Sequence, residues 1–189
     1  YNYRICHESI ASSMDNLHRQ MVLRKSIDML DQLHMQDALT GLYNRYAWIR
    51  FSEDYTDKDA YCVVFMDMDG LKKINDAYGH DAGNVALKIT AEAIKKSAHE
   101  NDLVTRCGGD EFQVLSTCVD THFWENLQKV INDEIDRQIA EQKLPYVFGV
   151  SYGYCISDKK NQLTFEECCD KADTLMYANK KIRKAERVN

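Results

Sequence analysis

Hydrophobic side chains at helical spacing mark the first 36 residues of the chain. Two sets, each spaced by four, three and four residues, follow one another after a shift of two: Ile10, Met14, Leu17 and Met21, then Leu23, Ile27, Leu30 and His34. The pattern predicts a long amphipathic helix. It is typical of a coiled coil with a break in phase, and equally of a single helix packed on its own domain.

After residue 37 the pattern changes to alternating helical and strand segments. Thr40-Gly41 ends the helical spacing, and a helix is predicted from Arg45 to about Phe51. Strands are predicted at 61–69, 103–107, 111–117 and 146–157, and helices from 71, at 82–101, 121–142 and 165–187. The apolar positions of the helix at 82–101 are 85, 87, 89, 91 and 94. This order predicts an α+β fold with a mainly antiparallel central sheet flanked by helices, in a domain over 37–189.

Composition narrows the class of protein. The 189 residues are 44% hydrophobic with a net charge of -6, which argues against a nucleic-acid binder held by bulk charge. No apolar run is long enough to cross a bilayer, so we expect a cytoplasmic domain. The first residue is Tyr1, and we therefore expect a longer protein with an upstream sensor or membrane part. The seven cysteines include no CxxC pair, which favours reduced thiols over disulfides or zinc ligands.

Four acidic side chains lie where strands are predicted to end or turn. Asp67 and Asp69 close the apolar strand "YCVVFMDMD", and period-two alternation puts both on one face. Asp110 and Glu111 follow Gly108-Gly109 inside a predicted hairpin. The ordinary interpretation is solvated turn residues. If the hairpin pairs with the first strand, however, the carboxylates converge and repel one another unless a hard divalent cation binds them.

A pair of magnesium ions between carboxylates and a triphosphate is typical of nucleotidyl transfer. That chemistry also gives the glycines a reason, because a residue without Cβ lets the backbone approach a phosphate or sugar closely. The segment "DGLKKIND" opens a helix just after the first acids, and its free N–H groups suit an anion.

At this point the chain resembles the GGDEF family of diguanylate cyclases, which condense two GTP into cyclic di-GMP and pyrophosphate. "RCGGDEF" is similar to the family's signature, and four further segments match in order: "DALTGLYNR", "DMDGLKKINDAYGHDAGN", "SYGY" and "ADTLMYANK". The resemblance covers about residues 37–188. It implies the palm-like nucleotidyl cyclase fold of that family, with GTP as substrate.

The resemblance also implies roles for individual residues. Metal ligands are implied at Asp67, the carbonyl of Met68, Asp110 and Glu111, for two Mg²⁺ ions with Mn²⁺ as an alternative, and one signature acid also helps to deprotonate the 3'-hydroxyl. Nucleotide contacts are implied at Gly70, Leu71, Lys72, Asn75, Asn84, Gly108, Gly109, Lys180 and Lys184. The opening turn, with Asp37, Asn44 and Arg45, corresponds to a structural and signal-relaying motif.

The sequence departs from the family at the second guanine-reading position, where Asn84 replaces an Asp. Guanine presents two adjacent donors to a carboxylate, whereas an amide matches the donor and acceptor of adenine. A lost bidentate contact costs on the order of 1–3 kcal/mol of discrimination. Relaxed base choice with a cyclic GMP-AMP product is one hypothesis. The other, which we favour, is that Asn84 still accepts one guanine hydrogen bond.

Two further departures concern regulation and phosphate binding. His99 and Asp102 occupy the family's inhibitory RxxD site, where His replaces the Arg that binds product. We therefore expect weak or absent product inhibition. Lys184 stands where the family has an Arg, and Arg183 beside it is a candidate to compensate. Both charges also suit a helix C-terminus for reasons of its dipole alone.

Together these patterns predict a diguanylate cyclase domain preceded by a signalling helix. Each domain would hold one GTP, so catalysis needs a homodimer, which the N-terminal helix would bring together. The alternative from another class is a catalytically silent domain that binds GTP or a protein and relays a signal.

Overall fold

The computed structural model describes residues 14, 17–25, 34–56 and 58–186, and its contacts divide the chain into two units, 1–36 and 37–189. In the first unit, residues 14 and 17–25 are helical as predicted, while Ile10, Ile27 and Leu30 lie outside the described residues. Its large apolar side chains are exposed: Met14, Leu17, Met21, Val22 and Leu23. None of the helices in the described ranges is long and apolar enough to span a bilayer.

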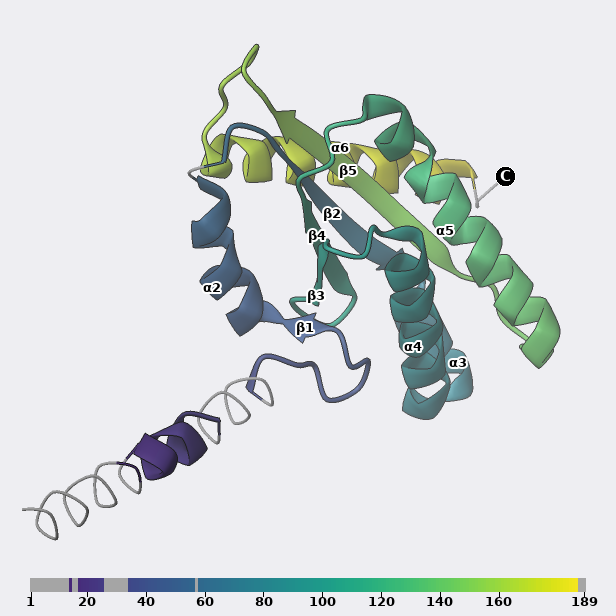
Figure 1. Ribbon diagram of the computed structural model, residues 1–189. Coiled ribbons are helices and arrows are strands. Elements are labelled where there is room, and N and C mark those ends of the chain that lie inside the picture. Colours follow the sequence, from purple (N-terminus) through teal and green to yellow (C-terminus); the bar gives the residue numbers. More distant parts are fainter. Residues whose placement is uncertain (1–13, 15–16, 26–33, 57, 187–189) are drawn as a thin grey trace, which may run out of the picture. The chain divides into compact units, whose positions relative to one another are not determined.

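A five-stranded sheet lies at the centre of the second unit (Figure 1). Its strands are β1 (Tyr43–Asn44), β2 (Tyr61–Asp69), β3 (Leu103–Arg106), β4 (Glu111–Ser116) and β5 (Gly149–Ser157). They are arranged in the order β1-β3-β4-β2-β5. The short β1 pairs parallel with β3, and every other pairing is antiparallel. The predicted α+β fold with a mainly antiparallel sheet is therefore confirmed.

Strand β2 is an interior strand of this sheet, because it pairs with β4 on one side and β5 on the other. Both of its faces are covered, which explains why its sequence is apolar almost throughout rather than alternating. Cys62, Val64 and Met66 belong to one core cluster, and Tyr61 and Val63 belong to the other. Odd-numbered residues of β2 thus face one layer of helices and even-numbered residues face the other.

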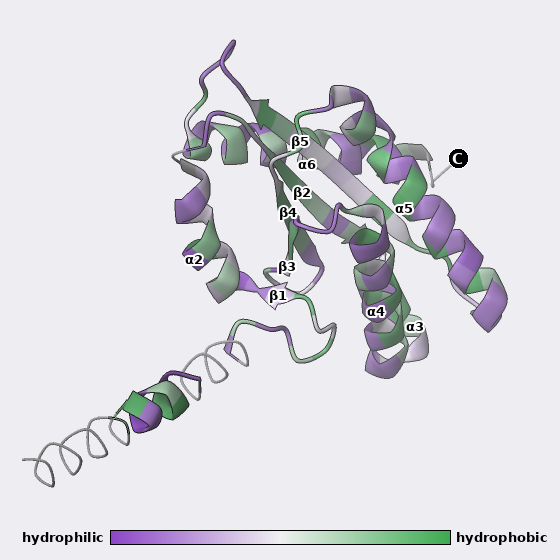
Figure 2. Ribbon diagram, in the orientation of Figure 1, coloured by the Kyte–Doolittle hydropathy of each residue, from purple (hydrophilic) through white to green (hydrophobic). Residues whose placement is uncertain are grey.

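The helices form two layers around the sheet. They are α2 (Arg45–Thr56), α3 (Leu71–Tyr78), α4 (His80–Ser97), α5 (Thr121–Gln142) and α6 (Phe165–Glu186). The larger core unites one face of β2 and β4 with α3, α4 and α5, and the smaller one joins the opposite face to α2 and α6. Figure 2 shows the hydrophobic central strands between helices whose outer sides are hydrophilic.

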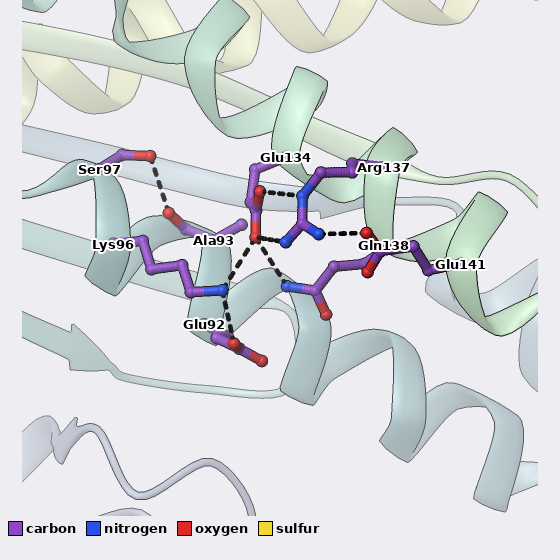
Figure 3. Close-up of polar contacts among 8 residues, drawn as sticks. All are labelled: Glu92, Ala93, Lys96, Ser97, Glu134, Arg137, Gln138 and Glu141. Atoms are coloured by element: carbon purple, nitrogen blue, oxygen red, sulfur yellow. Dashed lines mark hydrogen bonds and ion pairs between the residues drawn. The ribbon is translucent and has the colours of Figure 1, made fainter.

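Helices α4 and α5 are also bridged by exposed polar groups (Figure 3). Glu134 accepts a hydrogen bond of 3.0 Å from Lys96 Nζ and one of 2.7 Å from Arg137 Nη2. Exposed ion pairs of this kind contribute only about 0–1 kcal/mol each. The two helices are therefore held mainly by apolar contacts.

Some predicted boundaries and one predicted buried position were wrong. Helix α2 runs to Thr56 rather than to Phe51, and β5 begins at Gly149 because the segment before it is not paired. On α4, Val85 is 36% exposed. The other predicted apolar positions are buried as expected, and so are several small residues: Leu87, Ile89, Ala91, Ile94, Gly83, Ala86, Thr90 and Ala93.

Candidate active site at the end of strand β2

The first predicted metal ligand, Asp67, lies near the end of β2 on the face covered by α6. Its Oδ1 is 2.5 Å from Nζ of Lys180, and only 10% of its side chain is exposed. Burial raises the pKa of Asp67, and the charge of Asp110 adds to this, while the hydrogen bond from Lys180 opposes it. The same pairing raises the pKa of Lys180 despite its partial burial.

Asp69 repeats this arrangement two residues further along β2. Its Oδ1 accepts a hydrogen bond of 2.7 Å from Ser151 Oγ, and its Oδ2 accepts one of 2.9 Å from Nε of Arg183. Asp67 and Asp69 therefore share one face of the strand, as period-two alternation predicted. Their cations are three residues apart on α6, which puts both on the side of that helix that meets the sheet.

Helix α6 can lie this close because β5 carries Gly153 beneath it. A Cβ at Gly153 would come within 2.2 Å of both the carbonyl oxygen of Ala172 and the amide nitrogen of Met176. These contacts are with the backbone of the helix, so they cannot be relieved by a side-chain rotation. The glycine of "SYGY" thus sets the distance between α6 and the sheet, and with it the reach of Lys180.

The signature acids lie beside β2, because the hairpin of β3 and β4 pairs with it. Glu111 faces Asp67 in the antiparallel register, and the amide of Met68 donates to the carbonyl of Asp110 over 2.9 Å. Cross-strand partners have their side chains on the same face of a sheet. Asp110 is half-buried and Glu111 is exposed. The structure thus brings together the acids that the sequence predicted to converge.

The backbone conformation of the signature turn does not require glycine at positions 108 and 109. Positive φ angles occur at Gly41, Gly70 and Gly79, but not at Gly108 or Gly109. A Cβ at Gly109 would meet no atom within 4 Å, and one at Gly108 would lie 3.0 Å from Oε2 of Glu111. The protein therefore leaves the space beside Gly109 open, whereas a side chain at Gly108 would crowd Glu111.

Arg106 holds the signature turn by hydrogen bonds. No role was predicted for this residue from the sequence. Its Nη2 donates to the carbonyl of Gly109 over 2.7 Å, and its Nη1 donates to Oδ1 of Asp37 over 3.0 Å. Asp37 also accepts from the amide and hydroxyl of Thr40. Burial raises the pKa of Asp37, but the hydrogen bonds from Thr40 and Arg106 outweigh it and lower the pKa overall. The opening turn and the signature turn are thus joined by one guanidinium.

A surface pocket of about 390 Å³ lies beside this junction rather than over the acids. It is lined by Asp37, Asn44, Arg45, Tyr46, Arg106, Cys107 and Gly108. The side chain of Asn44 caps α2 by accepting from the amide of Ala47 over 3.1 Å. These contacts agree with the structural role expected for the opening turn.

The predicted base-reading residues lie on α3 and α4. Oδ1 of Asn75 is buried and has no hydrogen-bond partner among the described residues. A Cβ at Gly83 would lie 1.9 Å from that oxygen, so the glycine gives Asn75 its room. Asn84 follows Gly83 directly and is half-buried. A buried acceptor without a partner costs about 1–3 kcal/mol.

The remaining predicted positions are placed as follows. Gly70, at φ 92°, caps α3, so that Leu71 and Lys72 form its first turn directly after Asp69. Lys184 is exposed near the end of α6, where no hydrogen bond or ion pair joins it to another described residue. It does not join the acids as Lys180 does.

At the position of the family's inhibitory site, His99 and Asp102 bind each other. The backbone amide of His99 donates to Oδ2 of Asp102 over 2.9 Å, and Nδ1 lies 3.3 Å from the same oxygen. The imidazole also packs on Phe123, with ring centroids 4.3 Å apart.

Oxygen donors at Asp67, Met68, Asp110 and Glu111 are the kind that hard divalent cations prefer. Within the described residues, however, no three His, Cys, Asp or Glu side chains are already arranged around a point that could hold an ion. Lys180 supplies the positive charge at Asp67 instead. A metal ion would fit this donor set by taking the place of the ammonium group there.

Comparisons with known proteins agree with this geometry. Residues 34–186 match the model of the GGDEF domain family, described as "Diguanylate cyclase, GGDEF domain". The chain is 32% identical over 151 residues to the probable diguanylate cyclase DgcT of Escherichia coli, covering 77% of this chain and 33% of the relative. It is 35% identical over 132 residues to the cyclic di-GMP phosphodiesterase NbdA of Pseudomonas aeruginosa, covering 66% and 16%.

The fold is also similar to a crystal structure of the coiled coil and GGDEF domain of DgcB from Caulobacter crescentus in complex with c-di-GMP. The TM-score is 0.72 at 21% identity, over 90% of this chain and 93% of that one. The chain spans about a third of the length of the first of these curated relatives and about a sixth of the second. With the family model matching most of its length, the chain belongs to the GGDEF family of diguanylate cyclase domains.

Proposed function

We propose that this domain is an active diguanylate cyclase that condenses two GTP into cyclic di-GMP and two pyrophosphates. The observation that carries the proposal is the register of β2 and β4, which sets Glu111 of the signature directly opposite the buried Asp67. Drifted domains that only bind have no need of acids at these positions. Here the pair is intact, and Lys180 lies against Asp67.

Asp67, the carbonyl of Met68, Asp110 and Glu111 would hold the divalent ions, with two Mg²⁺ as the expected pair and Mn²⁺ as an alternative. Such ions lower the pKa of the attacking 3'-hydroxyl and offset the charge of the phosphates. The protein's part is to hold the carboxylates on rigid strands and to bring α6 over them. Displaced from Asp67, Lys180 would be free to contact the triphosphate.

The nucleotide would lie between the turn of Gly108 and Gly109 and the helix N-terminus that begins after Gly70. The amides of Leu71 and Lys72 are free N–H donors of the first turn of α3, which suits phosphate oxygens. The open space beside Gly109 supports close approach of a ligand to that backbone.

The base would be read by Asn75 and Asn84. The unpartnered Oδ1 of Asn75 is an acceptor, which suits the N–H groups of guanine. We therefore keep GTP as the substrate, with relaxed base choice and a cyclic GMP-AMP product as the alternative. Replacing Asn84→Asp should raise the preference for GTP over ATP about tenfold. An unchanged ratio would remove Asn84 from base selection.

Catalysis would take place in a homodimer, because each 3'-hydroxyl must attack the α-phosphate held by the other domain. The exposed apolar residues Leu17 and Met21 of the N-terminal helix support pairing of two chains. A longer cytoplasmic or membrane-anchored protein with an upstream sensor would set that pairing. Nucleic acid is not an expected partner at a net charge of -6.

A catalytically silent relay is the rival function, supported by the changes at Asn84 and His99 and by relatives that are named phosphodiesterases. Turnover separates the two. The 189-residue chain at high concentration would be incubated with Mg²⁺ and GTP, ATP or both, and the products resolved by mass. Cyclic di-GMP from GTP alone supports the proposal, a hybrid product supports relaxed base choice, and bound GTP without product supports the relay.

A further inference from the structure

Arg183 combines a buried anchor with unused hydrogen-bond donors. Its Nε donates to Oδ2 of Asp69 over 2.9 Å, and its side chain is 25% exposed. No other hydrogen bond or ion pair joins Arg183 to the described residues, so both of its outer NH₂ groups lack a partner there. A guanidinium carries five donors in a planar fork, and four of the five are left for a ligand or water.

The anchor itself is held on both sides. Asp69 is almost completely buried, and Ser151 of β5 donates to its other oxygen over 2.7 Å. Arg183 is therefore tied through Asp69 to two strands of the sheet, and its guanidinium is already placed before any ligand arrives. Pre-organised donors contribute more to binding than mobile ones, because less side-chain entropy is lost.

The geometry of α6 separates Arg183 from its neighbour Lys184. At about 100° per residue, position 183 lies about 60° to one side of Lys180 on the helix and position 184 about 40° to the other. Arg183 turns toward the end of β2, where Asp69 meets it, whereas Lys184 is exposed. The cation that the family pattern expects at 184 thus stands one position earlier, on the side of the acids.

Binding of a metal ion would affect the hydrogen bonds of Arg183 and Lys180 differently. The ion would take Asp67 away from Lys180, but Asp69 is not among the proposed metal ligands. Arg183 therefore keeps its anchor while Lys180 is released. The outcome is two cations three residues apart on α6 at the end of β2, one mobile and one fixed.

From these contacts we propose that Arg183, anchored by Asp69 and Ser151, is the guanidinium that binds the phosphates of the nucleotide, and that Lys184 is not. This inference rests on the proposed function, since it assumes a nucleoside triphosphate at the acids. It assigns Arg183 as a substrate-binding residue. It also makes Asp69 a positioning residue, which acts only through Arg183.

Binding titrations separate this role from a merely structural one. Affinities for GTP, GMP and guanosine would be measured with Mg²⁺ on the 189-residue chain and on Arg183→Ala, Arg183→Lys, Lys184→Ala and Lys181→Ala. We expect Arg183→Ala to weaken GTP about tenfold or more and guanosine less than twofold. Arg183→Lys should recover part of the loss, and Lys184→Ala should cost less than threefold. Lys181, exposed and stacked on Tyr177, is the neutral control.

Three results would overturn the inference. The first is a larger loss of GTP affinity in Lys184→Ala than in Arg183→Ala. The second is an equal loss of affinity for guanosine and for GTP in Arg183→Ala, which would mean that Arg183 only stabilises the position of α6. The third is wild-type protein that binds no GTP, which would also remove the proposed function. GTP binding that depends on Arg183 without any product would sink the cyclase proposal alone.

Discussion

Lys180 on α6 lies with its ammonium nitrogen 2.5 Å from a carboxylate oxygen of Asp67 at the end of β2. One helix therefore supplies the positive charge that the acidic end of the sheet needs before any metal ion binds. The position of α6 depends in turn on Gly153, over which the helix backbone passes at a distance that leaves no room for a Cβ. The packing of α6 on Gly153 therefore determines whether Lys180 can reach Asp67.

Replacing Gly153→Ala should push α6 away from β5. The added Cβ would lie 2.2 Å from backbone atoms of Ala172 and Met176, so the helix itself must shift. Overpacking of this kind costs about 1–3 kcal/mol of unfolding free energy. Turnover should fall at least tenfold, because Lys180 and Arg183 move with the helix. Denaturant unfolding and initial rates test this, and unchanged values for both would contradict the account.

Replacing Gly109→Ala is the matched test of the signature turn. The new methyl group meets nothing within 4 Å in the protein, and the residue does not have a positive φ. The unfolding free energy should change by less than about 0.5 kcal/mol. GTP affinity should nevertheless fall about tenfold, because the methyl group occupies the space proposed for the nucleotide. Wild-type affinity in this variant would mean that the ligand lies elsewhere.

The link between the opening turn and the signature turn should be sensitive to acid. The pKa of Asp37 is lowered below its ordinary value of 3.8 in the folded protein. The unfolded chain therefore binds a proton at a pH where the folded protein does not. The stabilisation is complete above about pH 5 and is lost as the pH falls through the folded pKa.

Replacing Asp37→Asn should remove this part of the acid dependence and loosen the hold of Arg106 on Gly109. The measurement is the unfolding free energy of both proteins between pH 7 and pH 3. The difference between them should shrink as the pH falls. A difference that stays constant over the range would show that the charge of Asp37 plays no part in the stability of the junction.

Product inhibition should be restored by His99→Arg. In the wild type the imidazole is bonded to Asp102 and packed on Phe123, and it has no fork for a phosphate. We expect cyclic di-GMP to bind the wild type weakly at this site, and the variant to bind it at least tenfold more tightly. Isothermal titration with the product tests this. Tight binding by the wild type that His99→Ala abolishes would refute the interpretation.

The sequence predicted the acids at the end of β2 because strand alternation is a local property. It placed Asp67 and Asp69 on one face, and the hairpin signal led to Asp110 and Glu111. Strand β1 was missed because two residues are too few for a periodicity, and its partner β3 is distant in sequence.

Sequence reasoning gave the phosphate contact to Lys184 by motif position and named Arg183 only as a candidate to compensate. Only the packing of α6 on the sheet separates the two side chains, because Arg183 meets Asp69 there while Lys184 is exposed. The outward position of Val85 could not be predicted from spacing either, because α4 also buries small residues at Gly83, Ala86, Thr90 and Ala93.

The most direct test of the central claim is product formation by the wild type and by Asp67→Asn, each with Mg²⁺ and GTP at the same high protein concentration. The variant keeps the shape of the side chain but loses the charge. The account predicts cyclic di-GMP from the wild type and a rate about a hundredfold or more lower from the variant. Asp136→Asn, an exposed change on α5, should retain the wild-type rate. Equal rates from Asp67→Asn and the wild type would contradict the assignment of this site.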